Sequence, residues 1–162
     1  MRIGILFRVL LLFFSAYTLP VSACAQVNED EETIEERRSR ADDLFQKEDY
    51  TAAMPIYSGL LANSRNSSDL NYHYGVCVLY ASSDKSIALP FLQKASRDPN
   101  VDPEVWFFLG RAYHLNYQFM SAMKSYQQYK SKAGDKQITK RQIDNQIAMC
   151  KTGNKLLRTI TD

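Results

Sequence analysis

The stretch VWFFLGRAYHLNYQFMSAMKSYQQYK, residues 105–130, decides which fold this chain is expected to have. Within it, Trp106, Leu109 and Tyr113 recur at spacings of three and four residues, so they form one apolar stripe along a helix. Gly110 lies within that stripe, where a glycine costs about 1 kcal/mol of helix propensity relative to alanine. The glycine is explained if a second helix crosses the first at this point, with Ala122 as the matching small contact. The stretch therefore predicts a helical hairpin.

The same hairpin pattern occurs three times along the chain. Two series of small residues share a period of 34 or 35 residues: Ala41, Gly75 and Gly110 in one series, and Ala53, Ala88 and Ala122 in the other. Two interleaved series at one period indicate two helices per unit. We expect the units at about residues 40–66, 69–99 and 103–132, inside a repeat region spanning 40–135. A further helix, over about residues 136–158, is expected to cover the apolar end of the stack.

The third unit resembles a tetratricopeptide repeat. Bulky and small residues lie at the positions where that family needs bulk or closeness: Trp106, Leu109, Gly110, Tyr113, Phe119, Ala122, Tyr126 and Tyr129. The resemblance implies an all-α fold, a tetratricopeptide-like stack of about three helix-turn-helix repeats with a C-terminal capping helix. It also implies that the chain acts by binding other proteins.

A narrower resemblance covers nearly all of the chain after its N-terminal segment. Residues 71–77, 88–92, 109–117 and 150–157 look like the N-terminal repeat module of a family of Gram-negative envelope proteins. In that family, tetratricopeptide repeats precede a β-propeller and an OmpA-like peptidoglycan-binding domain, and some members are associated with type IX secretion at the outer membrane. This sequence ends at Asp162, near the point where the propeller would begin. We therefore expect a stand-alone or truncated member, or one with its other domains on a separate polypeptide, and peptidoglycan binding is not carried over.

Residues 1–25 have the pattern of a secretory signal peptide: Arg2, an apolar stretch divided by Arg8, and small residues before Gln26. Two processing routes are open. The sequence Ala-Cys-Ala at 23–25 fits cleavage before Gln26, which we favour, whereas Val-Ser-Ala-Cys at 21–24 resembles a bacterial lipobox, in which Cys24 would be acylated and tether the protein to a membrane. A transmembrane helix is the weaker third choice because Arg8 divides the apolar stretch. The expected location is the periplasm or the periplasmic face of the outer membrane.

Charge gives no indication of a nucleic-acid partner. The chain has 20 basic and 18 acidic residues, and removal of Arg2 and Arg8 with the signal peptide leaves 18 of each. Residues 26–39 are expected to be an acidic linker or the start of the first helix. Thr33 followed by Glu36 matches a capping box, which favours a helix start there. Thr51 and Ser86 are expected to cap the second helices of the first two units, and Pro55 and Pro90, four residues later, are expected near the first turns of those helices.

The side chains that most often carry chemistry do not form a catalytic or metal-binding pattern. His73 and His114 lie in the first helices of successive units, and neither has a carboxylate or cysteine at ligand spacing. Cys77 and Cys150 fall within apolar patterns and are expected to be buried free thiols. We therefore expect no enzymatic activity, no cofactor, no metal and no small-molecule substrate.

The expected binding surface is the groove along the first helices, at positions that the core does not use. These positions are Tyr72, His73, Val76 and Tyr80 in the second unit and Phe107, Phe108, Arg111 and His114 in the third. Aromatic residues are common in binding hot spots, and Arg111 could pair with a carboxylate or a phosphate. The alternative for each aromatic residue, especially Phe107, is that it packs against the neighbouring repeat. The lysine and asparagine clamp of chaperone-tail-binding family members is absent.

These observations predict a non-enzymatic adaptor that binds a protein partner in a cell-envelope assembly, one example being type IX secretion. The alternative is a cell-wall-associated factor that binds a peptidoglycan enzyme or a glycan through the aromatic groove.

Overall fold

The computed structural model describes residues 32–161, and these residues form an all-α stack of helical hairpins. The hairpins are α1 (Ile34–Gln46) with α2 (Tyr50–Asn63), α3 (Ser68–Ala81) with α4 (Ala88–Ala95), and α5 (Glu104–Leu115) with α6 (Phe119–Lys132). A short 3-10 helix, η1 (Lys85–Ile87), precedes α4, and α7 (Asp135–Lys140) and α8 (Ile143–Thr161) follow the last hairpin. No strand occurs within residues 32–161. The predicted fold class is confirmed, while the signal segment 1–25 and Cys24 lie outside the described residues.

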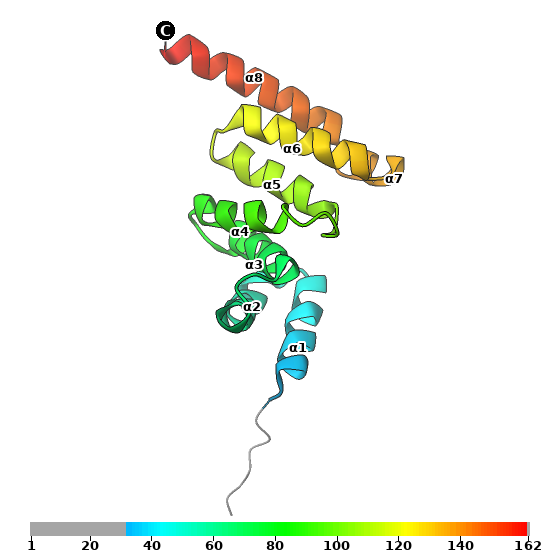
Figure 1. The fold of residues 1–162 in the computed structure, drawn as a ribbon. Coiled ribbons are helices and arrows are strands. Elements are labelled where there is room, and N and C mark those ends of the chain that lie inside the picture. The colour runs from blue at the N-terminus through cyan, green and yellow to red at the C-terminus, as the bar shows by residue number, and fades with distance from the viewer. Residues whose placement is uncertain (1–31, 162) are drawn as a thin grey trace, which may run out of the picture. The chain divides into compact units, whose positions relative to one another are not determined.

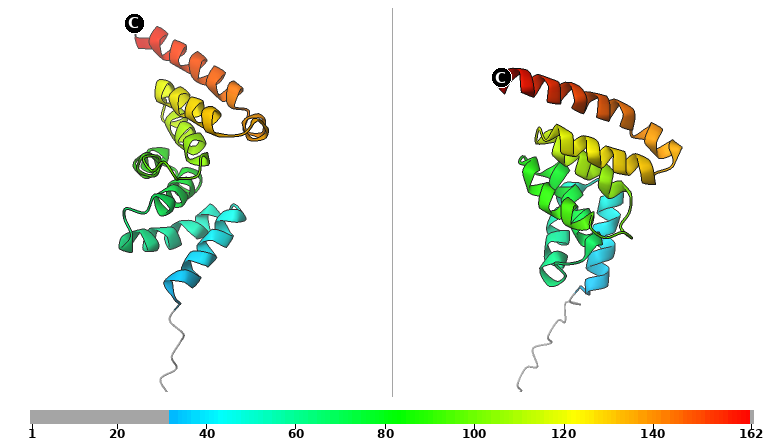
Figure 2. Two further views of the ribbon diagram at one scale, coloured as in Figure 1. Left: turned by 45° about the vertical axis from the view of Figure 1, so that its right-hand side comes forward. Right: turned by 45° about the horizontal axis from the view of Figure 1, so that its top comes forward.

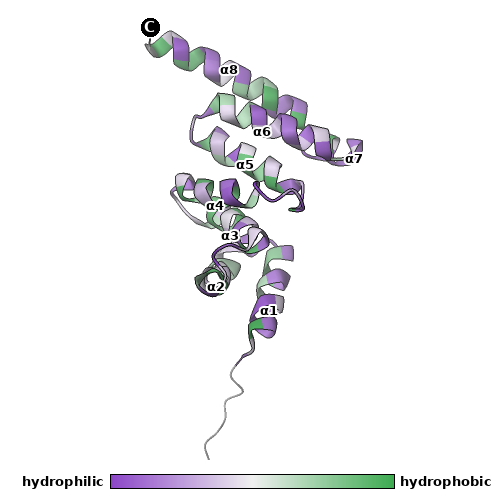
Figure 3. Ribbon diagram, in the orientation of Figure 1, coloured by the Kyte–Doolittle hydropathy of each residue, from purple (hydrophilic) through white to green (hydrophobic). Residues whose placement is uncertain are grey.

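Each helix of the stack packs on the helix that precedes it in the hairpin series, and α8 packs on α6. The colour in Figure 1 accordingly runs in order from the blue α1 to the red α8, and the views in Figure 2 keep the same succession. Figure 3 shows hydrophilic and hydrophobic residues interspersed along the helices, as expected when each helix buries only part of its circumference.

The small residues of the repeat allow the two helices of a hairpin to approach closely. A Cβ atom added at Gly75 would lie 2.8 Å from Cγ of Leu92, and one at Gly110 would lie 2.7 Å from Cδ1 of Tyr126. The close approach predicted at Gly110 is therefore present. Its partner differs from the prediction, however, because the nearest atoms belong to the Tyr126 ring rather than to Ala122.

Side-chain caps fix where α1 and α2 begin. Thr33 and Glu36 form the predicted capping box, and α1 starts at Ile34. The expectation that Thr51 caps the next helix is wrong, because the Asp49 carboxylate accepts from the backbone N–H of Ala52 and α2 starts at Tyr50.

The start of the second hairpin's second helix also differs from the sequence pattern. Ser86 does not cap α4. It lies inside η1, and the Asp84 side chain accepts hydrogen bonds from its backbone N–H and its hydroxyl. Pro55 lies inside α2 and not in its first turn, because that helix begins earlier than the pattern suggested. Pro90, by contrast, is in the first turn of α4, where a missing N–H leaves no helical bond unmade.

The first and third hairpins share one turn geometry. Glu48 and Tyr117 both have φ of 59°, in the left-handed region, and each begins the return of the chain into the second helix. The backbone N–H of the following residue then donates to a carbonyl in the first helix, from Asp49 to Leu44 and from Gln118 to Tyr113, at 2.9 Å in both cases. The repeat is therefore conserved within the chain at the level of the turn backbone, although the turn residues differ.

The C-terminal region covers the last hairpin in two pieces. The single helix expected there is divided at Gln142, which has φ of 50°, into α7 and α8. Ile143 and Cys150 are fully buried against the stack, so α8 acts as the predicted cap. Its outer side is not wholly polar, however: Met149, Leu156 and Ile160 are exposed.

Candidate protein-binding groove

Four of the eight predicted groove residues are part of the hydrophobic core. Tyr72, Val76, Phe107 and Phe108 expose 7%, 0%, 3% and 5% of their surface and belong to one buried cluster. The Phe108 ring lies 6.0 Å from the Tyr72 ring of the preceding repeat, measured between centroids. These side chains hold neighbouring repeats together in this structure, and their use in binding stays a prediction.

Two of the other four residues, Tyr80 and Arg111, form a partly exposed cluster with Tyr50, which is not among the predicted groove residues. Arg111 donates from Nη1 to the Tyr80 hydroxyl at 3.0 Å, and its guanidinium carbon lies 5.2 Å from the centroid of the Tyr80 ring. The Tyr80 ring also stacks on the ring of Tyr50, the first residue of α2, at 4.7 Å between centroids. Because Tyr80 remains 37% exposed, this cluster offers an aromatic edge beside a fixed cation.

The two predicted histidines are half-buried and lie apart from each other in the stack. The Nδ1 atom of His73 lies 2.9 Å from the backbone oxygen of Asp69 and 3.2 Å from its carboxylate, so the expectation that no carboxylate accompanies His73 is wrong. The His73 ring contacts Phe45 at 4.6 Å between centroids. The ring of His114 contacts Phe119 at 5.6 Å. Burial and the nearby Arg111 charge lower the pKa of His114 below its usual range.

Arg141, at the junction of α7 and α8, covers the aromatic residues predicted for the third repeat. Its guanidinium carbon lies 4.5 Å from the centroid of the Phe107 ring and 5.4 Å from that of Phe108. It also pairs with Glu104 at 2.7 Å, and the Tyr129 hydroxyl donates to the same carboxylate at 2.6 Å. The sequence analysis missed this contact because α7 lies outside the repeat, so periodicity gives no information about it.

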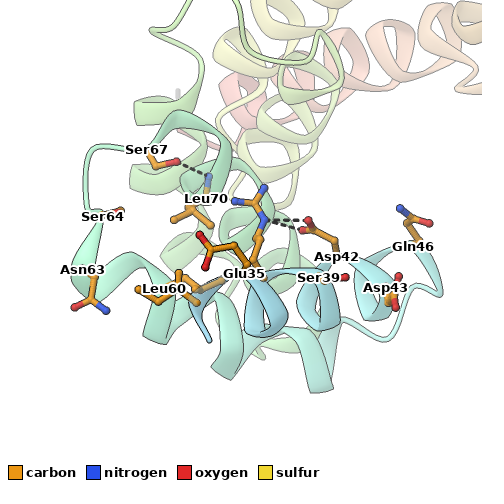
Figure 4. Close-up of a pocket in the computed structure, with 12 residues that line it drawn as sticks. Glu35, Ser39, Asp42, Asp43, Gln46, Leu60, Asn63, Ser64, Ser67 and Leu70 are labelled. Atoms are coloured by element: carbon orange, nitrogen blue, oxygen red, sulfur yellow. Dashed lines mark hydrogen bonds and ion pairs between the residues drawn. The ribbon is translucent and has the colours of Figure 1, made fainter. Parts of the chain in front are cut away.

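One opening along the first helices is at the first repeat. A cavity of about 640 Å³ lies beside α1 and is closed by the end of α2 and the start of α3 (Figure 4). Its polar residues come mainly from α1, and its apolar wall includes Leu60 and Leu70. The α1 contribution comprises Ile34, Glu35, Arg38, Ser39, Asp42, Asp43 and Gln46.

This cavity occupies the first-repeat equivalent of the predicted groove. The positions 34 residues before Tyr72, His73, Val76 and Tyr80 are Arg38, Ser39, Asp42 and Gln46, and all four line it. The sequence therefore contained the signal for these residues, because the repeat period leads directly from the second unit to the first. The groove residues predicted from the sequence come only from the second and third units.

Some charged side chains of the cavity have an ion-pair partner and others have none. Arg38 donates from Nε to both carboxylate oxygens of Asp42 at 3.0 Å and also pairs with Asp69 of α3. A hydrogen bond with His73, supported by the Arg38 charge, lowers the pKa of Asp69 to about 2. Arg38 is thus neutralised by two carboxylates.

Two further carboxylates at the cavity remain without a partner. Within residues 32–161, the side chains of Glu35 and Asp43 form no hydrogen bond or ion pair, and both are exposed. Asp42 is already occupied by Arg38 and by the Tyr57 hydroxyl, which donates to it at 2.6 Å. The unsatisfied charge of the cavity is therefore negative.

The buried thiols and the acidic residues do not form a metal site. Cys77 and Cys150 are buried and free, as predicted, and burial raises the pKa of these thiols to about 12 and about 11. Among residues 32–161, no group of three histidine, cysteine or acidic side chains could hold a metal ion. None of the helices described in this range has the length and hydropathy needed to cross a membrane.

Comparisons with known proteins support the fold. No protein-family model and no curated protein matches the sequence. The structure is similar to the TPR2B-domain:pHsp70-complex of yeast Sti1, with a TM-score of 0.59 and 19% identity over 74% of this chain and 96% of that chain. It is also similar to the MamA RS-1 ArsTM double mutant, with a TM-score of 0.56 and 18% identity over 82% of this chain and 79% of that chain. These likenesses show that residues 32–161 have a tetratricopeptide-like repeat fold.

Proposed function

We propose that this protein is a non-enzymatic adaptor that binds a partner polypeptide along the face formed by α1, α3 and α5. The observation that carries this proposal is the cavity at the first repeat, which combines an apolar wall with two unpaired carboxylates. Ligand sites of this size are concave and place a few polar groups against an apolar lining. The TPR2B domain of yeast Sti1, which has a similar fold, forms a complex with pHsp70, and this gives a precedent for a polypeptide ligand on this fold.

The partner segment that fits this cavity carries a basic side chain. Glu35 and Asp43 are eight residues apart on α1, or about 12 Å along the helix axis, so they flank the cavity. A lysine or arginine of the partner would place its ammonium or guanidinium group at one of these carboxylates and its aliphatic stem against Leu60 or Leu70. Arg38 would not repel it strongly, because its charge is already balanced by Asp42 and Asp69.

We also propose that the adaptor works in the cell envelope, in the periplasm or at the periplasmic face of the outer membrane. The support is the signal-like segment at residues 1–25 and the resemblance to envelope proteins associated with type IX secretion. Acylation of Cys24 is the proposed means of tethering if the lipobox is used. Cell fractionation with intact-mass measurement of the mature protein tests both points, since an acylated Cys24 and an N-terminus at Gln26 give different masses.

The glycan-binding form of the cell-wall alternative needs open aromatic rings along the groove, whereas binding of a peptidoglycan enzyme would be a case of the adaptor function. Tyr72, Phe107 and Phe108 are buried, and Arg141 covers the last two, so a glycan finds little exposed ring surface there. The adaptor is therefore the function that we put forward.

The test of the adaptor compares the wild-type chain with a Glu35→Gln/Asp43→Asn double variant. Both substitutions keep the side-chain shape and remove the charge. Proteins recovered with the wild type from envelope fractions are identified by mass spectrometry, and each is then purified and its affinity measured by calorimetry at two salt concentrations. Because hydrogen bonds to charged groups contribute about 1.5–3 kcal/mol each, we expect the double variant to bind at least about tenfold more weakly.

Asp135→Asn is the matched control, because Asp135 is an exposed carboxylate in the first turn of α7, outside the cavity. It should bind like the wild type. Equal affinity of the wild type and the double variant for the purified partner, or no salt dependence, would show that the partner does not use this cavity.

A further inference from the structure

A second crevice lies on the other side of α2 from the cavity at the first repeat, which is called the groove cavity below. It has a volume of about 320 Å³ and is formed by α2, α4 and the start of α3. Leu61 and Ala62 line it, whereas the neighbouring Leu60 and Asn63 line the groove cavity. The two openings therefore use different sides of the same helix, and a ligand in one leaves the other free.

The crevice has the opposite charge character to the groove cavity. Its apolar walls are Leu61, Pro90 and Phe91, its charged residues are Arg65 and Lys94, and no carboxylate from residues 32–161 lines it. The Arg65 guanidinium is exposed and forms no hydrogen bond or ion pair with the described residues. A cation without a partner beside an apolar wall is suited to a ligand that carries both an apolar group and a negative charge.

The polar side of the crevice is held in place by three hydrogen bonds. Asn71 is 2% exposed, and its Nδ2 donates to the backbone carbonyls of Arg65 and Ser67 at 2.9 and 2.6 Å. Lys94 Nζ donates to the same Arg65 carbonyl. The backbone of the turn that carries Arg65 is thus fixed from two helices, so this part of the crevice need not be ordered when a ligand arrives.

The repeat period indicates the kind of apolar group that fits. Asn71 lies 35 residues before Trp106, the same interval that separates Gly75 from Gly110. In the third repeat, the chain itself places an indole at this position, and Trp106 packs against the main hydrophobic cluster. In the second repeat, an amide stands there instead. The apolar wall beside this amide, formed by Leu61, Pro90 and Phe91, stays open to an aromatic group from another molecule.

We propose that this crevice binds an aromatic side chain flanked by a carboxylate on a partner polypeptide. The ring would pack between Leu61 and the Pro90–Phe91 pair, and the carboxylate would pair with Arg65 and Lys94. An aromatic anchor in a pocket next to an arginine has the composition of a binding hot spot. The site is independent of the proposed groove, so either can fail without the other.

The test uses the peptide acetyl-Gly-Ser-Glu-Trp-Asp-Ser-Gly-amide and the 15N-labelled full chain. We expect saturable chemical-shift changes confined to residues 61–65 and 90–94. A peptide with alanine in place of tryptophan should bind at least about tenfold more weakly, and so should one with glutamine and asparagine in place of the two acids.

Protein variants locate the site. Arg65→Glu/Lys94→Glu should abolish the shifts, whereas Arg97→Glu, which reverses an exposed cation in the turn after α4, should bind like the wild type. Asn71→Trp should also weaken binding, because its own indole would occupy the crevice. If circular dichroism shows that a multiple or core variant has lost helicity, the single surface variant Arg65→Gln replaces it, with weaker binding expected.

Three results would overturn the proposal. One is the absence of saturable shifts in the crevice at millimolar peptide. Another is equal binding of the tryptophan and alanine peptides, or of the wild type and the folded Arg65 variants. The third is that inorganic phosphate alone reproduces the shifts and competes fully with the peptide, which would show an anion site without an aromatic specificity.

Discussion

Gly110→Ala is the substitution that most directly tests how the hairpins are packed. Gly110 lies in the middle of α5, and a Cβ atom there would be 2.7 Å from both Cδ1 and Cε1 of Tyr126. Tyr126 is fully buried, so its ring has no solvent side into which it can withdraw. Either the ring or the helix axis must shift to accommodate the methyl group.

Two opposing free energies decide the outcome. Alanine is favoured over glycine inside a helix by about 1 kcal/mol. Overpacking a well-packed core costs about 1–3 kcal/mol, and a contact with a buried aromatic ring belongs at the upper end of that range. We therefore expect Gly110→Ala to reduce the free energy of unfolding by about 1–2 kcal/mol. Gly110→Leu adds more volume at the same point and should prevent the third hairpin from packing.

Gly59→Ala is the matched control, because Gly59 lies inside α2 and nothing lies within 4 Å of an added Cβ atom. It should gain the propensity term alone, about 1 kcal/mol. Urea titration followed by circular dichroism at 222 nm measures both variants, and they should move from the wild type in opposite directions. Stabilisation of both by a similar amount would refute the reasoning, since the Tyr126 ring would then be free to move away from Gly110.

Two further predictions concern titration and thiol reactivity. Because the folded-state pKa of His114 is lowered, the unfolded chain binds more protons between that value and pH 6.5, so this residue makes stability fall as the pH falls through that window. Urea midpoints at pH 7.5 and 5.5 should therefore differ less in His114→Gln than in the wild type, and an unchanged difference would exclude His114 as the cause. Cys77 and Cys150 should react with Ellman's reagent only after unfolding, because both are buried and their thiol pKa values are raised. Rapid reaction of either thiol in the folded protein would contradict its burial.

The repeat period predicted the fold because it records contacts inside each hairpin. Gly75 and Gly110 each mark a close approach of paired helices, and both are found where the period places them. The caps were less predictable. Asp49 and Thr51 are two positions apart, and both are good N-cap residues. The left-handed turn is at Glu48, directly before Asp49, so Asp49 rather than Thr51 is the cap.

The groove was harder to predict because exposure depends on what covers a position as well as on its place in the repeat. Phe107 lies on a first helix at a groove position, yet Arg141 from outside the repeats packs over its ring. Trp106 and Asn71 occupy equivalent positions in neighbouring repeats but have different surroundings. The indole of Trp106 packs against the main hydrophobic cluster, whereas the amide of Asn71 donates to backbone carbonyls of the preceding turn. Periodicity therefore gives the position of a residue within the repeat, and the side chains that pack around it decide whether a partner can reach it.

Equivalent positions also give the proposed groove a direction. Asp42, Val76 and Arg111 are separated by 34 and 35 residues, so one position of the first helix is acidic, then apolar, then basic along the stack. The acidic end has unpaired carboxylates nearby, and at the basic end Arg111 keeps donors beyond the one it gives to Tyr80. A partner segment that follows this face must therefore present its basic residue to the first repeat and its acidic residue to the third. Reversing the segment would place like charges together at both ends. Repulsion at two ends selects one orientation more strongly than repulsion at one end.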